Sequence, residues 1–333
     1  MTAMDASTSG RRGRSTSIGA LVLRRAGSGL LTVWLISVLV FLAVHVLPGN
    51  AAIGLLGRDT NQLALHALTK QLGLDRSLPY QYWHWVTGFV TGKWGDSLVS
   101  PQPVSALVMR HVANTAVLTL FTMLITVPLA IVVGTWCAVR NGKAFDNGVS
   151  MVTLCLSAIP GFAIGVLVIY LLATNVLHVL PAASTLDPTA SVWTQLKFVV
   201  APMIAVVLST VPYPLRMVRA SMIDVLQSDF VMMARLKGLP ERRVIFRHAL
   251  RNGLGPMVQS LTLTLVFLTG GIVVVETVFS YPGVGYALVQ AVNERDVPVV
   301  QTLVVLIALA CVLINLISDL AVIAVTPRLR SRS

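Results

Sequence analysis

The stretch that decides the fold runs from Gln227 to Pro256 and reads QSDFVMMARLKGLPERRVIFRHALRNGLGP. It lies inside a very apolar chain, yet it contains no apolar run of the roughly 20 residues that a bilayer-spanning helix needs. It also carries six basic residues, namely Arg235, Lys237, Arg242, Arg243, Arg247 and Arg251. This composition indicates a structured segment held at the membrane surface.

The first half of the stretch has the pattern of a short helix with a sharp end. Ser228 suits the N-cap position, and Asp229 in the first turn and Lys237 in the last turn both favour the helix dipole. Gly238 then supplies the left-handed residue that commonly follows a helix. We therefore predict a helix over residues 229–237 that ends in a turn at Gly238.

A second amphipathic helix is expected after that turn. Pro240 and Glu241 are favourable in the first turn of a helix. Helical spacing then places three basic residues on one face, namely Arg243, Arg247 and Arg251. The other face is expected to be apolar and to hold Ile245, Phe246 and Ala249.

The composition of the whole chain indicates a membrane protein. Of the 333 residues, 55% are hydrophobic and 11% are charged, whereas a soluble domain has about 25% charged residues. The formal charge of +12 falls in particular loops, which favours the positive-inside rule over nucleic-acid binding. Cys137, Cys155 and Cys311 lie in apolar runs, where we expect small buried side chains rather than disulfides or metal ligands.

Hydropathy divides the chain into six spans. We expect a basic N-terminal tail over 1–27, a first transmembrane helix over 28–47, an extracytoplasmic segment over 48–111 and a C-terminal tail over 326–333. The core, 112–325, contains five apolar runs and a cytoplasmic loop over 216–256. The runs are Val112–Val139, Val149–Val176, Phe198–Val211, Val258–Phe279 and Val297–Val325.

The distribution of Lys and Arg gives the orientation. With both termini in the cytoplasm, 18 of the 25 basic residues lie in inside segments and 7 in outside segments. This asymmetry favours that topology and places the stretch Gln227–Pro256 in the cytoplasm.

The apolar runs hold few polar side chains that suggest a substrate path. Glu276 in the fifth run, Asn114 in the second and Asn315 in the sixth are the candidates, because polar groups inside a membrane are costly and often functional. They are scattered near span ends, so packing or hydrogen bonding between helices is the favoured alternative to a proton relay.

The sequence shows no recognisable catalytic centre. It has neither an H-E-x-x-H nor a G-x-S-x-G motif, and Gly92-Lys93 lacks the leading glycine and the following Ser or Thr of a phosphate-binding loop. We expect no catalytic residue, cofactor or metal on this chain, so any ATP and Mg would be bound by partner subunits.

Three phrases resemble one family of transport proteins. Met233, Ala234 and the turn Arg235–Gly238 resemble the EAA loop of ABC importer permeases, although Met232 stands near the place of the family's acidic residue. The phrases LGLDRSLPYQYW (Leu72–Trp83) and VETVFSYPGVG (Val275–Gly285) resemble permeases of the dipeptide, oligopeptide and nickel type. Lys93 stands where that family usually has Asp.

The resemblance implies an all-α integral membrane protein with the type I permease fold, six transmembrane helices and both termini cytoplasmic. It implies a bacterial inner-membrane subunit that forms half of a path for di- or oligopeptides. The implied partners are a second homologous permease, ABC ATPase subunits and an extracytoplasmic substrate-binding protein. The cargo stays open among dipeptides, oligopeptides, glutathione-like thiols and nickel chelates.

The resemblance also implies which residues contact the ATPase. The expected docking surface consists of Met233, Ala234, Leu236, Gly238 and Leu239, with Arg235 and Arg242 as a charged rim. The alternatives are a secondary transporter or channel that works alone, which would need internal repeats, and a membrane-embedded enzyme, which would need a catalytic set. We find neither feature in the sequence.

Overall fold

The computed structural model describes residues 18–46, 76–174, 177–187 and 192–325. The phrase Leu72–Trp83 is described only from Arg76 onward. The N-terminal tail up to residue 17, most of the segment 48–111 up to residue 75, and the C-terminal tail 326–333 lie outside the described residues.

The described residues form helices and no named strand, as the all-α prediction requires. Those that precede the segment Gln227–Pro256 are α1 (Ile18–Val46), α4 (Leu78–Val90), α5 (Val104–Val139), α6 (Ala144–Ala158), α7 (Gly161–Ile169) with the π-helix η1 (Tyr170–Thr174), the 3-10 helix η2 (Val192–Gln195), α8 (Lys197–Thr210) and α9 (Pro212–Leu226). The rest are α10 (Asp229–Leu236), α11 (Glu241–Arg243), the π-helix η3 (Val244–Ala249), α12 (Leu250–Val278), α13 (Val284–Glu294) and α14 (Val297–Val325).

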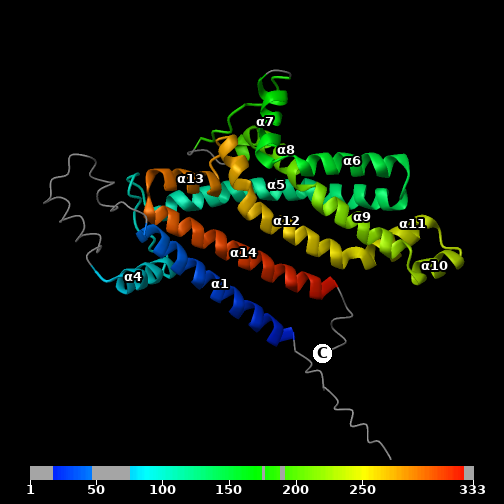
Figure 1. The fold of residues 1–333 in the computed structure, drawn as a ribbon, viewed down its shortest axis with the longest axis horizontal. Helices are drawn as coiled ribbons and strands as arrows, with labels where there is room; N and C mark the ends of the chain where they lie inside the picture. The colour runs from blue at the N-terminus through cyan, green and yellow to red at the C-terminus, as the bar shows by residue number, and fades with distance from the viewer. Residues whose placement is uncertain (1–17, 47–75, 175–176, 188–191, 326–333) are drawn as a thin grey trace, which may run out of the picture.

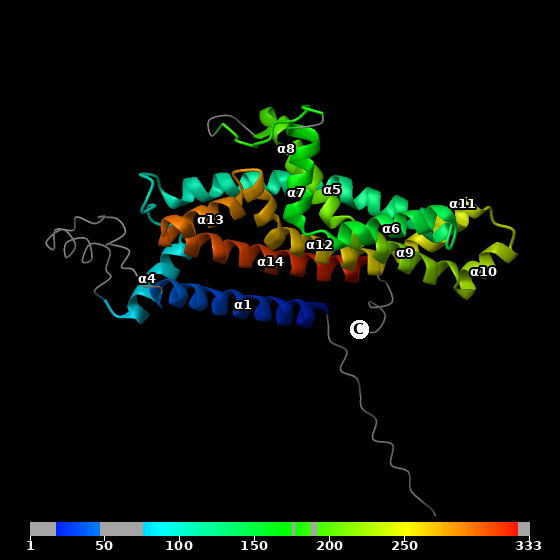
Figure 2. The same ribbon diagram turned by 45° about the horizontal axis from the view of Figure 1, so that its top comes forward.

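The long helices run side by side, and α7 stands across them (Figures 1 and 2). By length and composition three helices are able to cross a membrane, namely α1, α5 and α14. Three more spans are possible if each of three bent helix pairs counts as one. This agrees with the six apolar runs of the sequence.

The third run is not the single span expected over Val149–Val176. Helices α6 and α7 meet at an angle of 101°. The break has a local cause, because Pro160 excludes the helical conformation from the residue before it, and Ile159 has an extended ψ of 126°. The fourth run bends by only 42° between α8 and α9, and α9 continues it to Leu226.

Helices α5 and α9 approach each other closely through a glycine. A Cβ atom on Gly134 would lie 2.9 Å from the carbonyl oxygen of Leu215 and from a methyl group of Val218. Close backbone approach at small residues is a main source of helix association in membranes, where apolar burial gives no driving force between helices. The pair therefore forms a tight unit that leads from the membrane core to α10.

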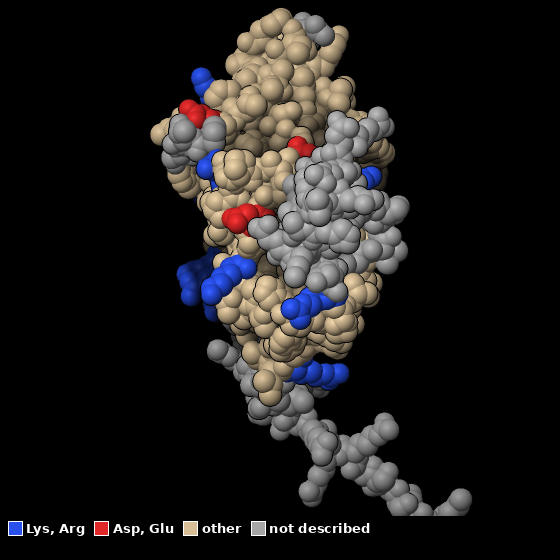
Figure 3. All heavy atoms as spheres, turned by 90° about the vertical axis from the view of Figure 1, so that its left-hand side faces the viewer, with Lys and Arg blue, Asp and Glu red and all other residues tan. Residues whose placement is uncertain are grey.

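The ends of the chain that the structure describes lie at the same end of the molecule as α10. The first turns of α1 and the last turns of α14 both point toward α10 (Figures 1 and 2). An ion pair of 3.3 Å joins Arg25 of α1 to Asp319 of α14. The opposite end, near α4 and α13, shows only scattered acidic and basic side chains on a mostly uncharged surface (Figure 3).

Candidate functional site

The predicted helix before Gly238 is present as α10, Asp229–Leu236. Gly238 has a φ of +73°, the left-handed value expected from its position. Its N–H donates to the carbonyl of Arg235 at 2.9 Å, and the N–H of Leu239 donates to the carbonyl of Ala234 at 3.4 Å. These two bonds are those of a Schellman motif, which ends the helix sharply.

The start of α10 differs in detail from the expectation. Ser228 occupies the N-cap position with an extended backbone, but its side chain makes no capping bond. The hydroxyl instead donates to the carbonyl of Val225 at 2.5 Å. The serine therefore fixes the end of α9 rather than the start of α10.

One face of α10 packs into the protein. Val231 and Ala234 are buried in an apolar cluster. The same cluster contains Ala138 of α5, Val218 and Met222 of α9, Val244 and Ala249 of η3, and Met257 of α12. Helix α10 is thus held to α9 and α12 by a shared core.

The opposite face of α10 is apolar and open. Met232, Met233 and Leu236 are 60%, 55% and 72% exposed, and their spacing of three and four residues puts them on one face. We call these three residues the coupling surface. Exposed apolar side chains grouped on one helix face at the end of a molecule mark an interaction site.

Two residues of the expected docking surface lie elsewhere. Ala234 is only 7% exposed, and Leu239 is half-buried against the same cluster. The Schellman motif explains both positions, because it brings the residue after the glycine against the last turn of the helix. Ala234 and Leu239 thus belong to the core on which the coupling surface rests. Met232, which was not among the expected docking residues, is part of the coupling surface.

The charged rim is present, and one of its members is paired. Arg235 forms an ion pair of 2.7 Å with Glu241, and this pair joins the two sides of the turn at Gly238. The hydrogen bond to Glu241 raises the pKa of the Arg235 guanidinium above its ordinary value. Both side chains are about half exposed, so the pair contributes at most about 1 kcal/mol. Arg242 is exposed.

The second helix of the segment contains a π-helical turn. The expected apolar face is confirmed for Ala249, which is buried, and for Ile245, which packs against the same cluster, but it is wrong for Phe246, which is 62% exposed. In η3 each hydrogen bond spans five residues instead of four, so that Val244 and Ala249 share the buried face.

Glu276 and Asn114 are buried and belong to a network at the C-terminal end of α12. The Glu276 carboxylate accepts hydrogen bonds from Thr115 at 2.6 Å, from the N–H of Gly285 at 2.7 Å and from the N–H of Tyr286 at 3.2 Å. These backbone donors lie at the start of α13, where a helix dipole favours a negative charge. Glu276 therefore anchors α13 to α5.

The same network fixes the turn between α12 and α13. The Asn114 side chain donates to the carbonyl of Pro282 at 2.7 Å, and the Tyr281 hydroxyl donates to the carbonyl of Asn114 at 2.7 Å. Burial raises the pKa of Tyr281, so that its hydroxyl keeps the proton it donates. The structure thus places Glu276 and Asn114 in hydrogen bonds between helices, and a place on the substrate path stays a prediction for both.

Asn315 is exposed, and its side chain donates to the carbonyl of Cys311 one turn earlier in α14. It lines a groove of about 490 Å³ between α1 and α14, together with Arg25 and Asp319. A place on the substrate path stays a prediction for this residue. Among the described residues no group of three His, Cys, Asp or Glu side chains is arranged to hold a metal ion.

The comparisons with known proteins agree with this geometry. Residues 130–331 match the model of the binding-protein-dependent transport system inner membrane component, and residues 19–134 match the model of the N-terminal part of such membrane components. The chain belongs to this family. It is a multi-pass inner-membrane permease of the ABC importer type, as the sequence predicts, and the stand-alone transporter is not supported.

Individual relatives cover almost the whole of this permease. It is 36% identical to the glutathione transport system permease protein GsiC of Pectobacterium atrosepticum over 90% of this chain and 95% of the relative. It is 35% identical to the protein of the same name from Escherichia coli K12, over 93% of this chain and 98% of the relative.

A solved structure supports the fold of the permease. A chain of the MetNI methionine ABC transporter in its inward-facing conformations superposes with a TM-score of 0.51 at 22% identity. The match covers 66% of the permease and 94% of that chain, and it confirms the type I permease fold.

Proposed function

We propose that this permease forms half of an ATP-driven path for small peptides and passes the motion of a separate ATPase to the membrane helices. The observation that carries the proposal is the coupling surface, Met232, Met233 and Leu236, exposed on a helix whose other face is buried. Apolar side chains grouped on one exposed helix face mark a surface to which a partner binds.

The position of α10 fits an ATPase as that partner. The charge asymmetry supports a cytoplasmic position for this segment, on the side of the membrane where ATP is available. The permease has no phosphate-binding loop of its own, so ATP and Mg would be bound by the partner. When two ATPases close on ATP, the groove that holds α10 would move, and α10 would move with it.

The buried face of α10 would pass this motion on. Val231 and Ala234 share one core with α9 and α12, so the three helices move together rather than singly. Packed cores switch between discrete arrangements rather than deform continuously, which suits a change between inward- and outward-open states.

The cargo and the remaining partners follow from the relatives. Since two relatives are named for glutathione transport, we propose a small peptide of that size as cargo. The family description names a binding protein, and a second homologous permease would complete the path. Calorimetric titration of the binding protein of the same system with glutathione and with dipeptides tests the cargo.

The change Leu236→Asp tests the docking proposal. It places a charge at the most exposed position of the coupling surface and leaves the buried core untouched. We expect the permease to insert normally but to lose its ATPase on purification, whereas Leu236→Met keeps it. Equal recovery of ATPase with both variants would overturn the docking role of α10, and a wild-type permease that brings no ATPase at all would overturn the proposed function.

A further inference from the structure

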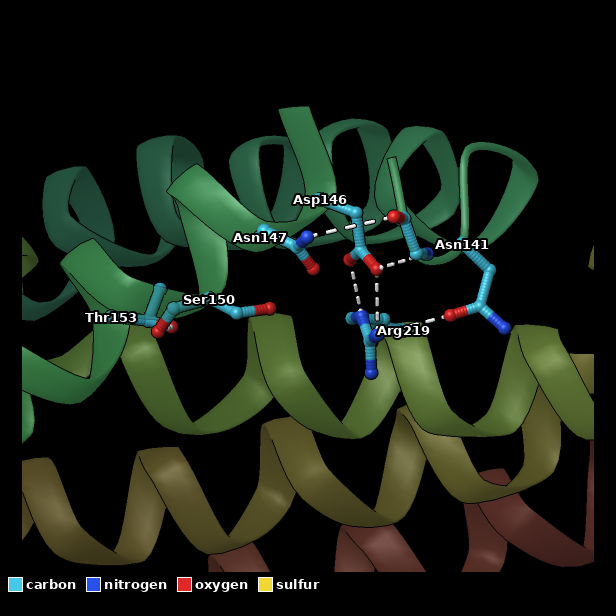
Figure 4. Close-up of polar contacts among 7 residues, drawn as sticks. Asn141, Asp146, Asn147, Ser150, Thr153 and Arg219 are labelled. Atoms are coloured by element: carbon cyan, nitrogen blue, oxygen red, sulfur yellow. Dashed lines mark hydrogen bonds and ion pairs between the residues drawn. The ribbon is translucent and has the colours of Figure 1, made fainter. Parts of the chain in front are cut away.

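The cytoplasmic turn between α5 and α6 is joined to α9 by an ion pair that the coupling surface does not include. Arg219 of α9 donates to both oxygens of the Asp146 carboxylate, from Nε at 2.5 Å and from Nη2 at 2.7 Å (Figure 4). The Asp146 side chain is completely buried, and that of Arg219 is 29% exposed. Such a two-pronged bond fixes the relative orientation of the two helices as well as their distance.

The turn itself is shaped to complete this site. Gly142 has a left-handed φ of +75°, and its N–H donates to Asp146 at 2.9 Å. Arg219 also donates to the side-chain oxygen of Asn141 at 3.2 Å. Asp146 lies in the first turn of α6, where the helix dipole favours its negative charge. Turn, α6 and α9 are therefore joined at one point, which we call the latch.

Packing alone holds α6 weakly. Only Asp146 and Thr153 are buried among its 15 residues. An apolar groove of about 460 Å³ runs between α6 and the helices α5, α8 and α9, and is lined by side chains such as Val133, Val152 and Leu215. A second contact, between the rings of Trp136 and Phe145, joins α6 to α5 only. The latch is thus the polar attachment of α6 to α9 in the described structure.

Arg219 stands on the helix that leads directly into the coupling surface. Its neighbours Val218 and Met222 lie in the core shared with α10, and only Gln227 and Ser228 separate α9 from α10. A displacement of α10 therefore moves Arg219.

The C-terminal end of α6 continues into α7, which packs beside the turn between α12 and α13. After the bend at Pro160, α7 packs with Gly165 against Val278 and Phe279, at 3.4 Å from the position of a Cβ atom. Phe279 follows the α12 turn that carries Glu276. Helices α6 and α7 thus connect the latch with the network that anchors α13.

We propose that Asp146 and Arg219 are positioning residues that transmit the movement of α10 to α6 and α7. This proposal rests on the proposed function, since it needs an ATPase that moves α10. Neither residue contacts ATP or cargo. Without the latch, α9 would follow the ATPase while α6 stays behind, so that ATP hydrolysis no longer drives the outer half of the path.

The test measures a distance in the assembled importer. In a variant with Cys137 and Cys311 replaced by alanine, spin labels are placed on Cys155, which is exposed on α6, and on Leu39→Cys, which is exposed on α1, a helix that packs against α14 and lies outside the unit of α5, α9 and α10. The distance between them is measured by electron paramagnetic resonance with and without ATP, and ATP hydrolysis is followed on the same samples. A change in this distance with ATP is expected when the latch is intact.

Asp146→Asn removes the charge with little change of shape, and Asp224→Asn is the matched control on an exposed carboxylate of α9. We expect Asp146→Asn to abolish the distance change while hydrolysis continues, and Asp224→Asn to preserve both. If Asp146→Asn does not assemble, Arg219→Lys replaces it, because lysine keeps the charge but cannot form the two-pronged bond.

The outcomes separate the two proposals. A full distance change in Asp146→Asn, or in Arg219→Lys where that variant is used, overturns the latch and leaves the docking of α10 intact. A wild-type importer in which the ATPase is absent, or in which a label on α10 does not move with ATP, overturns the proposed function and the latch with it.

Discussion

At the scale of single residues, Glu276 shows how a buried carboxyl group is satisfied in an apolar chain. Its carboxylate faces three donors, from Thr115, Gly285 and Tyr286. Thr115 also accepts from the N–H of Val284 at 2.8 Å, so its hydroxyl hydrogen is directed at Glu276. A buried acceptor with several donors is satisfied, whereas an unpaired buried charge would be very costly.

The change Glu276→Gln replaces one acceptor oxygen by an NH₂ donor and keeps the shape of the side chain. An amide NH₂ would face the Thr115 hydroxyl, which would lose its acceptor. We expect a loss of stability of about 1–3 kcal/mol, measured as a lower midpoint of thermal unfolding of the purified permease. The control is Glu294→Gln on the exposed end of α13. Equal midpoints for both variants would contradict the anchoring role of Glu276.

Gly285 is required by the close approach of α13 to α12. A Cβ atom at this position would overlap the Cα of Val273. We expect Gly285→Ala to destabilise the permease by about 1–3 kcal/mol. Gly148 lies in α6 with no atom near its Cβ position, so Gly148→Ala is expected to stabilise by about 0.5–1 kcal/mol. Thermal unfolding is expected to give a lower midpoint for Gly285→Ala than for Gly148→Ala. The reverse ranking of the two midpoints would refute the packing account.

The residue scale also shows what the sequence could not reveal. The phrase Val275–Gly285 stood out, but its partners Asn114 and Thr115 lie more than 150 positions earlier, and only the fold brings them together. The inward orientation of Ala234 was missed because the hydrophobicity of a residue does not indicate its face, whereas the turn at Gly238 followed from its residue type alone.

At the scale of elements, the turn at Gly238 sets the end of α10. Its φ of +73° is available to Gly without strain, is tolerated by Asn, and costs a β-branched residue about 1–2 kcal/mol. We expect Gly238→Val to open the last turn of α10 and to speed amide hydrogen exchange over residues 229–239 by about tenfold, with a smaller effect for Gly238→Asn. No difference between the two variants would show that the turn is not under conformational constraint.

Other elements were only partly predictable. Pro160 marks the end of α6 in the sequence, yet the angle of 101° to α7 depends on contacts with α8 and α12. The π-turn η3 has no sequence signature, and in it Val244 takes the buried place beside Ala249 that was expected for Phe246. The buried face of a membrane helix is generally hard to predict, because lipid tails are as apolar as leucine. The hydrophobic pattern therefore does not separate residues that face other helices from residues that face lipid.

At the scale of the whole molecule, hydropathy predicts the spans and the charge asymmetry predicts their orientation. Basic residues report on the side of the membrane independently of packing, which is why topology is predictable when helix contacts are not. The first turns of α1 and the last turns of α14 point toward the end of the molecule that holds α10, which fits this topology (Figure 1).

The topology itself gives a further prediction. In a cysteine-free variant, Thr91→Cys in the turn after α4 is expected to react with a membrane-impermeant maleimide in intact cells. Lys143→Cys, in the turn between α5 and α6, is expected to react only after permeabilisation. Both positions are exposed. Labelling of Lys143→Cys from outside would contradict the proposed orientation.

The central claim is that the coupling surface docks on an ATPase, and one measurement tests it most directly. A photo-crosslinking amino acid is placed at Leu236, 72% exposed, in the permease of its native membrane, and the product is identified by mass spectrometry. We predict a crosslink to a protein with a phosphate-binding loop, with a yield that changes when ATP is added. Crosslinks to lipid alone, or to a protein without such a loop, would contradict the claim.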